Sequence, residues 1–226
     1  MQTCDDVRPQ AAAVEGWLSD AQGCALFRCA AAAAGKGVIV EIGSWKGRST
    51  VWLAAGARIS DTRVYAVDPH RGSREDPQAD TLPEFKANLE RLALTRYVEP
   101  LVMTSAEAAR VVEGPIALLF IDGDHSVEAV RRDAALWLPK LVDGGIVMFH
   151  DVGAAGYAGP RDVFRRSVCW SKGFHRIRRV GSMAMARRIR RRSVWSGAWG
   201  ICAGLLLYLY DAKQALRRGS RVDRPG

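Results

Sequence analysis

Five apolar runs separated by helix-length stretches constrain the fold of this chain more than any other feature of its sequence. The runs are VIVEI (38–42), VYAV (64–67), VEPLVM (98–103), IALLFI (116–121) and IVMF (146–149). Apolar, β-branched segments of this kind are typical of buried strands. Strands that alternate with helices are typical of a parallel, doubly wound sheet. The sequence therefore predicts an α/β fold of the Rossmann-like type.

Apolar residues also recur at helical spacing between the runs, and we interpret them as the core-facing sides of helices. The N-terminal 35 residues are expected to form one or two helices that cap the sheet. Downstream, RIRRV (176–180) and SMAMA (182–186) are expected to pair as an antiparallel hairpin, which brings the sheet to seven strands. The helical positions are Leu82, Phe85, Leu89 and Leu92, and then Val127, Val130, Ala134, Trp137 and Leu141.

Length and charge predict three parts: an N-terminal helical cap (1–35), a ligand-binding sheet domain (36–188) and a C-terminal helix and tail (189–226). A chain of 226 residues suits one α/β domain with a modest appendage. The net charge of +9 is uneven, since residues 1–160 carry −5 and residues 161–226 carry +14. The excess of cations lies outside the main domain, so we expect no nucleic-acid partner.

Cysteine usage and the first residues indicate a cytoplasmic protein. The five cysteines are an odd number without a C-x-x-C pair, which argues against a disulfide framework and against a zinc site. The start, MQTCDDVRPQ, is polar and acidic, whereas a secretory signal needs a basic flank and an apolar stretch. The cysteines are Cys4, Cys24, Cys29, Cys169 and Cys202.

The uncharged run VWSGAWGICAGLLLYLY (194–210) allows two interpretations. Flanking cations and aromatic ends suit a membrane anchor within residues 187–218, which would hold the protein at the inner face of a membrane. As a helix the run would span about 25 Å, near the lower limit for a hydrocarbon core of about 30 Å. The alternative is a buried C-terminal helix, or one that joins two copies in a homodimer.

Polar residues follow each of the five apolar runs directly. In open α/β sheets, ligands bind beyond the carboxyl ends of the strands, so these residues should meet at one edge. They are EIGSWKG (41–47), Asp68, Thr104-Ser105, Asp122-Gly123-Asp124-His125 and His150-Asp151. This edge is the predicted functional site.

The first two of these groups indicate a cofactor that contains a ribose. Gly43 and Gly47 allow close approach of the backbone to a ligand, and Asp68 is placed to accept both hydroxyls of a ribose. Nicotinamide-dependent enzymes use G-x-G-x-x-G to hold a pyrophosphate, whereas this chain has E-x-G-x-x-x-G beginning at Glu41. A nicotinamide-dependent reductase is further disfavoured because no Tyr-x-x-x-Lys pair is present. A cofactor without a diphosphate fits better.

Taken together, these motifs resemble the class I S-adenosylmethionine-dependent methyltransferases over roughly residues 35–188. VEIGSWKGRST (40–50) is similar to the family's cofactor loop, and VYAVDPH (64–70) to its ribose-binding acidic turn. LLFIDGDHS (118–126) and GGIVMFHDV (144–152) are similar to the two later motifs of its cation-dependent O-methyltransferases.

The resemblance implies a set of residues around S-adenosylmethionine. Asp122, which directly follows the fourth run, is also expected among them. The others are Gly43, Ser44 and Gly47 beside the methionine part, Glu41 toward the methionine amine, Asp68 at the ribose and Ser105 near the adenine.

The harder half of methyl transfer is the removal of a proton from the attacking hydroxyl, which a divalent cation such as Mg²⁺ assists. We predict Asp122, His150 and Asp151 as its ligands. His125 is expected in the first turn of a helix, where the dipole favours a neutral ring, and is our predicted general base. Related sugar O-methyltransferases use an Asp-x-x-His in this role but usually have a carboxylate where His150 stands, so His150 is a ligand, a second base or a substrate contact.

Simpler interpretations of these residues remain open. Asp122 or His125 could cap a helix, and His150 could be a structural histidine. The predicted function is methyl transfer to a hydroxyl of a small molecule of the sugar, glycan or natural-product type. An RNA or DNA methyltransferase is one alternative, although the chain has IDGDH where base-amine enzymes usually carry an Asn/Asp-Pro-Pro-aromatic motif. A non-catalytic, membrane-associated module that keeps the fold is the other.

Overall fold

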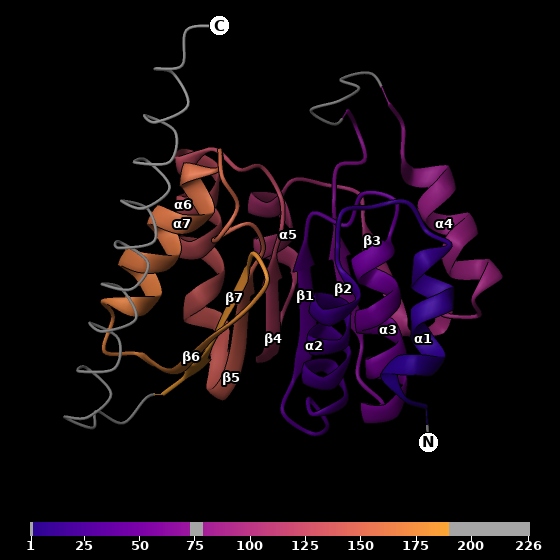
Figure 1. Cartoon of the computed structure of the whole chain (residues 1–226), viewed down its shortest axis with the longest axis horizontal. Coiled ribbons are helices and arrows are strands. Elements are labelled where there is room, and N and C mark those ends of the chain that lie inside the picture. The colour runs from indigo at the N-terminus through magenta and orange to yellow at the C-terminus, as the bar shows by residue number, and fades with distance from the viewer. Residues whose placement is uncertain (1, 73–78, 190–226) are drawn as a thin grey trace, which may run out of the picture.

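Seven strands form one sheet in the computed structural model, which describes residues 2–72 and 79–189. They are β1 (Val38–Ile42), β2 (Val64–Val67), β3 (Val98–Leu101), β4 (Ile116–Ile121), β5 (Leu141–Phe149), β6 (Phe174–Val180) and β7 (Met183–Arg188). The strand order is β3-β2-β1-β4-β5-β7-β6 (Figure 1). The first five strands are parallel, and β7 is antiparallel to β5 and β6. The predicted Rossmann-like sheet with a C-terminal hairpin is confirmed.

Helices cover both faces of this sheet. They are α1 (Cys4–Ala12), α2 (Asp20–Ala31), α3 (Arg48–Ser60), α4 (Leu82–Arg91), α5 (Ser105–Val111), α6 (Val127–Trp137) and α7 (Ala158–Phe164), with short turns η1 (Thr95–Tyr97), η2 (Leu138–Lys140) and η3 (Arg165–Cys169). Buried residues of α1 to α4 share one apolar cluster with the sheet, and those of α5 to α7 share the other. The result is a three-layer α/β/α arrangement.

The apolar runs of the sequence are continuous because both sheet faces are buried. Ile39 belongs to the cluster beneath α1 to α4, whereas its neighbour Val40 belongs to the opposite cluster. Leu118 and Leu119 divide in the same way. Successive side chains of a strand point to opposite faces, so a strand covered by helices on both sides needs an apolar residue at nearly every position.

The N-terminal helices pack into the main core through a close contact between α2 and α3. A Cβ atom at Gly23 would lie 2.2 Å from the ring of Trp52, so only glycine allows the two helices to approach this closely. Trp52 is buried, and Val7 and Leu26 lie in the same cluster as Ile39 of the sheet. The two predicted N-terminal helices therefore form and share the core of the sheet.

Two predicted boundaries were wrong. Leu141 was placed on the core-facing stripe of the helix over 127–141, but α6 ends at Trp137 and Leu141 is the first residue of β5. Pro139 lies in the turn between them, and proline cannot donate the hydrogen bond that would continue the helix. The third strand stops at Leu101, and the following Val102 is exposed.

The prediction that the cysteines form no disulfide was also wrong. Cys4 of α1 and Cys24 of α2 are joined by a disulfide, with their Cα atoms 5.3 Å apart. Counting cysteines and their spacing cannot reveal this pair, because its proximity arises from the packing of two helices. Cys29 and Cys169 are free cysteines, and Cys202 lies outside the described residues.

Within residues 2–72 and 79–189, no helix is long and apolar enough to cross a membrane. The apolar run 194–210 lies outside the described residues. Membrane contact through residues 187–218, the homodimer and the cytoplasmic location therefore stay predictions.

Candidate functional site

Backbone pairing carries the site residues to the carboxyl edge of the sheet. The N–H of Asp122 donates to the carbonyl of Ile42 at 2.8 Å, and the N–H of His150 donates to the carbonyl of Ile121 at 3.0 Å. The strand pattern thus continues one residue past β4 and β5, which are adjacent in the sheet. Asp122 and Asp151, far apart in sequence, are brought together in this way.

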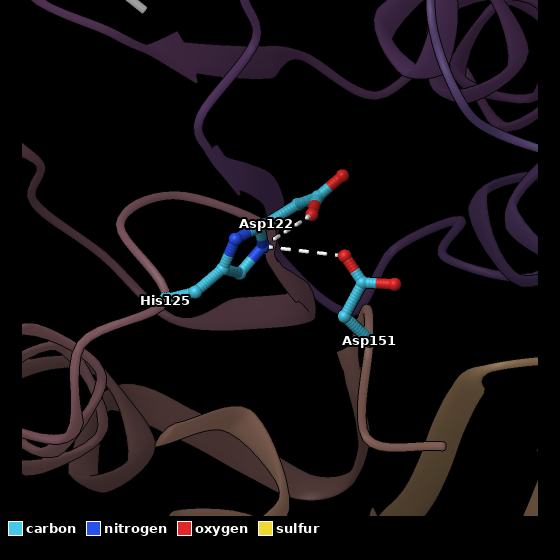
Figure 2. Close-up of side chains that lie close together, drawn as sticks. All are labelled: Asp122, His125 and Asp151. Carbon is cyan, nitrogen blue, oxygen red and sulfur yellow. Dashed lines mark ion pairs between the residues drawn. The ribbon is translucent and has the colours of Figure 1, made fainter. Parts of the chain in front are cut away.

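Asp122, His125 and Asp151 form a compact cluster, in which the imidazole points toward both carboxylates (Figure 2). His125 Nε2 lies 3.3 Å from Asp151 Oδ2 and 3.7 Å from Asp122 Oδ1. One ligand atom from each residue lies within 4.8 Å of the other two. The predicted ligand set has His150 as its third member, and this cluster adds His125 as a further candidate ligand.

Ser126 is the N-cap of α6, and its Oγ accepts from the N–H of Ala129 at 3.3 Å. The carboxylate of Asp124 in turn accepts from the N–H of Ser126 at 2.7 Å. Neither Asp122 nor His125 is the cap, and His125 precedes the helix instead of lying in its first turn as predicted. The side chains of Asp122 and His125 instead lie close to each other and to Asp151.

His150 is more deeply buried than this cluster and lies close to both of its carboxylates. Its Nδ1 is 3.2 Å from Asp122 Oδ1 and 3.2 Å from Asp151 Oδ2. Burial by itself would lower the pKa of His150, but its bonds to the two carboxylates outweigh this and raise the pKa to about 10. Burial would likewise raise the pKa of Asp122, yet its bonds to His125 and His150 lower it below the usual value. His150 is therefore positively charged near neutral pH and cannot accept a proton there.

The cofactor loop, defined here as residues 41–50, contains buried polar atoms without a partner among the described residues. Glu41 is fully buried, and its Oε2 accepts from Thr50 Oγ1 at 2.6 Å. Glu41 Oε1 and the hydroxyl of the buried Ser44 have no such partner. Buried polar groups are nearly always satisfied. An amine or another polar group of a ligand would satisfy both.

Burial makes the stability of the protein depend on the ionisation of Glu41. It raises the pKa of Glu41 to about 8, although hydrogen bonds from Ser49 and Thr50 oppose the shift. In the unfolded chain the carboxyl of Glu41 ionises near pH 4.5. Between pH 4.5 and 8 the folded protein therefore binds more protons than the unfolded chain does. The protein is therefore most stable below pH 4.5 as far as Glu41 is concerned. Its free energy of unfolding falls as the pH rises from 4.5 to 8, by at most about 1.4 kcal/mol per pH unit.

Thermal unfolding of wild type and Glu41→Gln across this pH range tests the prediction. The midpoint of wild type should fall relative to the variant as the pH rises, because glutamine does not ionise. A constant difference between the two proteins would contradict it.

Asp68, the predicted ribose ligand, holds the cofactor loop in place. Its Oδ2 accepts from the N–H groups of Ser44 at 2.9 Å and Trp45 at 2.8 Å, and its Oδ1 accepts from the N–H of His70 at 2.7 Å. The loop also passes directly against the end of β4, since a Cβ atom at Gly43 would lie 2.3 Å from the carbonyl oxygen of Asp122. Asp68 thus orients the loop, whatever contact it makes with a ligand.

The other two predicted cofactor residues lie at helix starts. Gly47 precedes α3 in the left-handed conformation, with φ of 94°, which glycine adopts at little cost. Ser105 begins α5, and its Oγ accepts from Trp137 Nε1 at 2.8 Å. Ser105 therefore takes part in the packing of α5 against α6.

Tyr157 is a site residue that sequence reasoning missed. Its ring centroid lies 4.2 Å from that of His125, so it covers one side of the imidazole. The start of α7 approaches His125 closely, because a Cβ atom at Gly159 would lie 2.2 Å from the His125 carbonyl oxygen. Tyr157 belongs to the Gly-rich stretch GAAGYAGP (153–160), whose composition predicts a loop and says nothing of this contact.

His70 was also missed, although it lies in the motif VYAVDPH. It lines a cavity of about 410 Å³ beyond the ends of β2 and β3, together with Pro69, Asp80 and Val102. Its Nδ1 lies 3.0 Å from Thr81 Oγ1, and its buried Nε2 has no partner among the described residues.

Comparison with known proteins places these features in a family. Residues 40–152 match the family model described as a methyltransferase domain. The chain is also 28% identical over 116 residues to an uncharacterised protein, y4gI, of Sinorhizobium fredii. That match covers 50% of this chain and 13% of the relative, so the chain spans only about an eighth of that protein's length.

Solved structures with the same fold include three that were determined with a cofactor or its product. Cofactor-bound Rv0187 from MTB is 21% identical with a TM-score of 0.62, over 83% of this chain and 89% of that one. The O-methyltransferase from Bacillus cereus in complex with SAH is 21% identical with a TM-score of 0.61, over 82% and 90%. TomG from Streptomyces achromogenes, in complex with SAM, is 16% identical with a TM-score of 0.59, over 83% and 96%. Identities this low establish a shared fold.

Proposed function

The chain belongs to the methyltransferase domain family, and from this premise we propose that it transfers a methyl group from S-adenosylmethionine to a hydroxyl of a small molecule with the help of a divalent cation. The cluster of Asp122, His125 and Asp151 beside the cofactor loop is the observation that carries the proposal. The acceptor we favour is of the sugar, glycan or natural-product type.

The cofactor loop has the chemistry to hold the methyl donor. S-adenosylmethionine supplies a methyl group that its sulfonium already makes electrophilic. The unpartnered oxygen of Glu41 and the hydroxyl of Ser44 would bind polar groups of its methionine part. Asp68 would keep the loop in its binding conformation through the N–H groups of Ser44 and Trp45.

The donor set at the cluster fits a hard divalent cation such as Mg²⁺. Asp122 and Asp151 supply the carboxylate oxygens that this ion prefers. A bound cation would lower the pKa of the acceptor hydroxyl. His150 lies on the buried side of both carboxylates, 3.2 Å from each, and orients them.

His125 is the group that would take the proton of the acceptor hydroxyl. It is partly exposed, whereas His150 is buried and already protonated near neutral pH. Asp151, 3.3 Å from Nε2, would stabilise the imidazolium that results. Tyr157, whose ring packs against the imidazole, would limit its rotation.

Two measurements test this function in the full chain. Calorimetric titration with S-adenosylhomocysteine should show binding, and its absence would contradict the assignment of the cofactor. Methyl transfer to a panel containing catechol and methyl α-mannoside should then fall on addition of EDTA and recover with Mg²⁺. Undiminished turnover in EDTA would remove the cation from the proposal.

A further inference from the structure

A seven-residue segment, residues 13–19, connects α1 to α2 and crosses the carboxyl edge of the sheet (Figure 1). We call it the N-terminal strap. Two polar contacts join it to the cofactor loop. Glu15 Oε2 lies 2.5 Å from Lys46 Nζ, and Arg48 Nη1 donates to the carbonyl of Gly16 at 2.9 Å. The strap is thus attached to the loop on either side of Gly47.

An aromatic contact adds a third attachment. The rings of Trp17 and Trp45 lie 4.6 Å apart, and Trp17 is 66% exposed. Trp45 has φ of 44°, a left-handed conformation that is unfavourable for a large side chain. Its N–H is held from one side by Asp68 and its ring from the other by Trp17. The strap therefore helps to maintain the strained turn of the cofactor loop.

The Cys4–Cys24 disulfide closes the chain around this strap. A crosslink of this kind reduces the number of conformations open to the residues between its ends. The two free thiols of the described residues are poorly reactive, because burial raises the pKa of Cys29 to about 11 and that of Cys169 to about 12. Within the described residues, redox chemistry is therefore concentrated at the disulfide between α1 and α2, the two helices that the strap connects.

We propose that the N-terminal strap positions the cofactor loop, and that the Cys4–Cys24 disulfide makes cofactor affinity depend on redox state by bracing the strap. The proposal rests on the proposed function, in which this loop binds S-adenosylmethionine. Reduction by a small dithiol breaks the S–S bond, transfers two electrons and two protons to form two thiols, and converts the dithiol to its own disulfide. If the reduced loop keeps its binding conformation about a tenth of the time, the apparent Kd rises about tenfold.

Calorimetry with S-adenosylhomocysteine on the full chain, before and after treatment with dithiothreitol, measures this effect. The Kd should rise about tenfold on reduction, and the double variant Cys4→Ser/Cys24→Ser should match reduced wild type in both conditions. Cys29→Ser, a matched control outside the strap, should retain the response of wild type. Equal affinity of the oxidised and reduced proteins would overturn the proposal.

Hydrogen exchange of residues 41–50 in the ligand-free protein provides a readout that needs neither cofactor nor turnover. Reduction, and separately Trp17→Ala, should accelerate exchange there, while Trp170→Ala, at another exposed tryptophan, should not. If neither redox form binds S-adenosylhomocysteine, the proposed function fails, and accelerated exchange would still support the strap. Unchanged exchange after both reduction and Trp17→Ala would overturn the role of the strap.

Discussion

Replacing Asp122 with Asn is expected to lower kcat/KM by about 10³-fold, one of the two largest effects expected among the substitutions proposed for this chain. The variant keeps the shape of the side chain but loses a charge that contacts both His125 and His150. It also removes one of the two carboxylates offered to a cation. The rate of S-adenosylhomocysteine formation, measured over a range of Mg²⁺ concentrations, checks this result.

Asp124→Asn is the matched control for that substitution. Asp124 lies two residues after Asp122 and is exposed. Its carboxylate accepts a hydrogen bond from the N–H of Ser126. Asparagine can make the same bond, so activity should stay near that of wild type. A rate for Asp122→Asn within about threefold of wild type, with unchanged dependence on Mg²⁺, would show that the cluster is not the catalytic centre.

Replacing His125 with Ala is expected to lower kcat by about 10² to 10⁴, the usual contribution of a general base. The buried His150 is a poor substitute for His125, because its bonds to the two carboxylates favour its protonated form. Single-turnover rates of wild type and the variant at one pH measure this effect.

Cation affinity separates the two roles that the position of His125 allows. A general base can be removed without loss of Mg²⁺ binding, whereas removal of a ligand weakens it. We expect calorimetric Mg²⁺ titrations of His125→Ala to resemble those of wild type. Loss of binding would reassign His125 as the third ligand of the cation, and near-normal turnover would remove it from catalysis. His175→Ala, at a histidine of β6 far along the chain, is the control for general effects of removing an imidazole.

The positive charge of His150 explains how two carboxylates can lie close together in this cluster. Two carboxylates as close as those of Asp122 and Asp151 would repel each other, and a positive charge between them offsets the repulsion. The residue that departs from the pattern of related enzymes thus serves as an internal counter-ion. Its burial explains why the imidazolium persists, since water does not compete for its hydrogen bonds.

Hydrophobic patterning alone determined the sheet, its parallel character and the edge at which the site lies. Each predicted apolar run coincides with all or part of a strand, because strands covered by helices on both faces leave a clear local pattern. The same pattern placed Asp122 and Asp151 at one edge, since Asp122 directly follows β4 and Asp151 lies two residues past the end of the adjacent strand β5. These conclusions need only the order of residues along the chain.

Tertiary structure decided the contacts that depend on distances between separate elements. It brought His125 as well as His150 against the two carboxylates, turned Asp68 toward the loop, and paired Cys4 with Cys24 across two helices. The stacking of Trp17 on Trp45 likewise joins residues that no periodicity connects. Local sequence encodes which face of an element is buried, whereas the partner of a given side chain depends on how whole helices and strands pack, and that is a property of the complete fold.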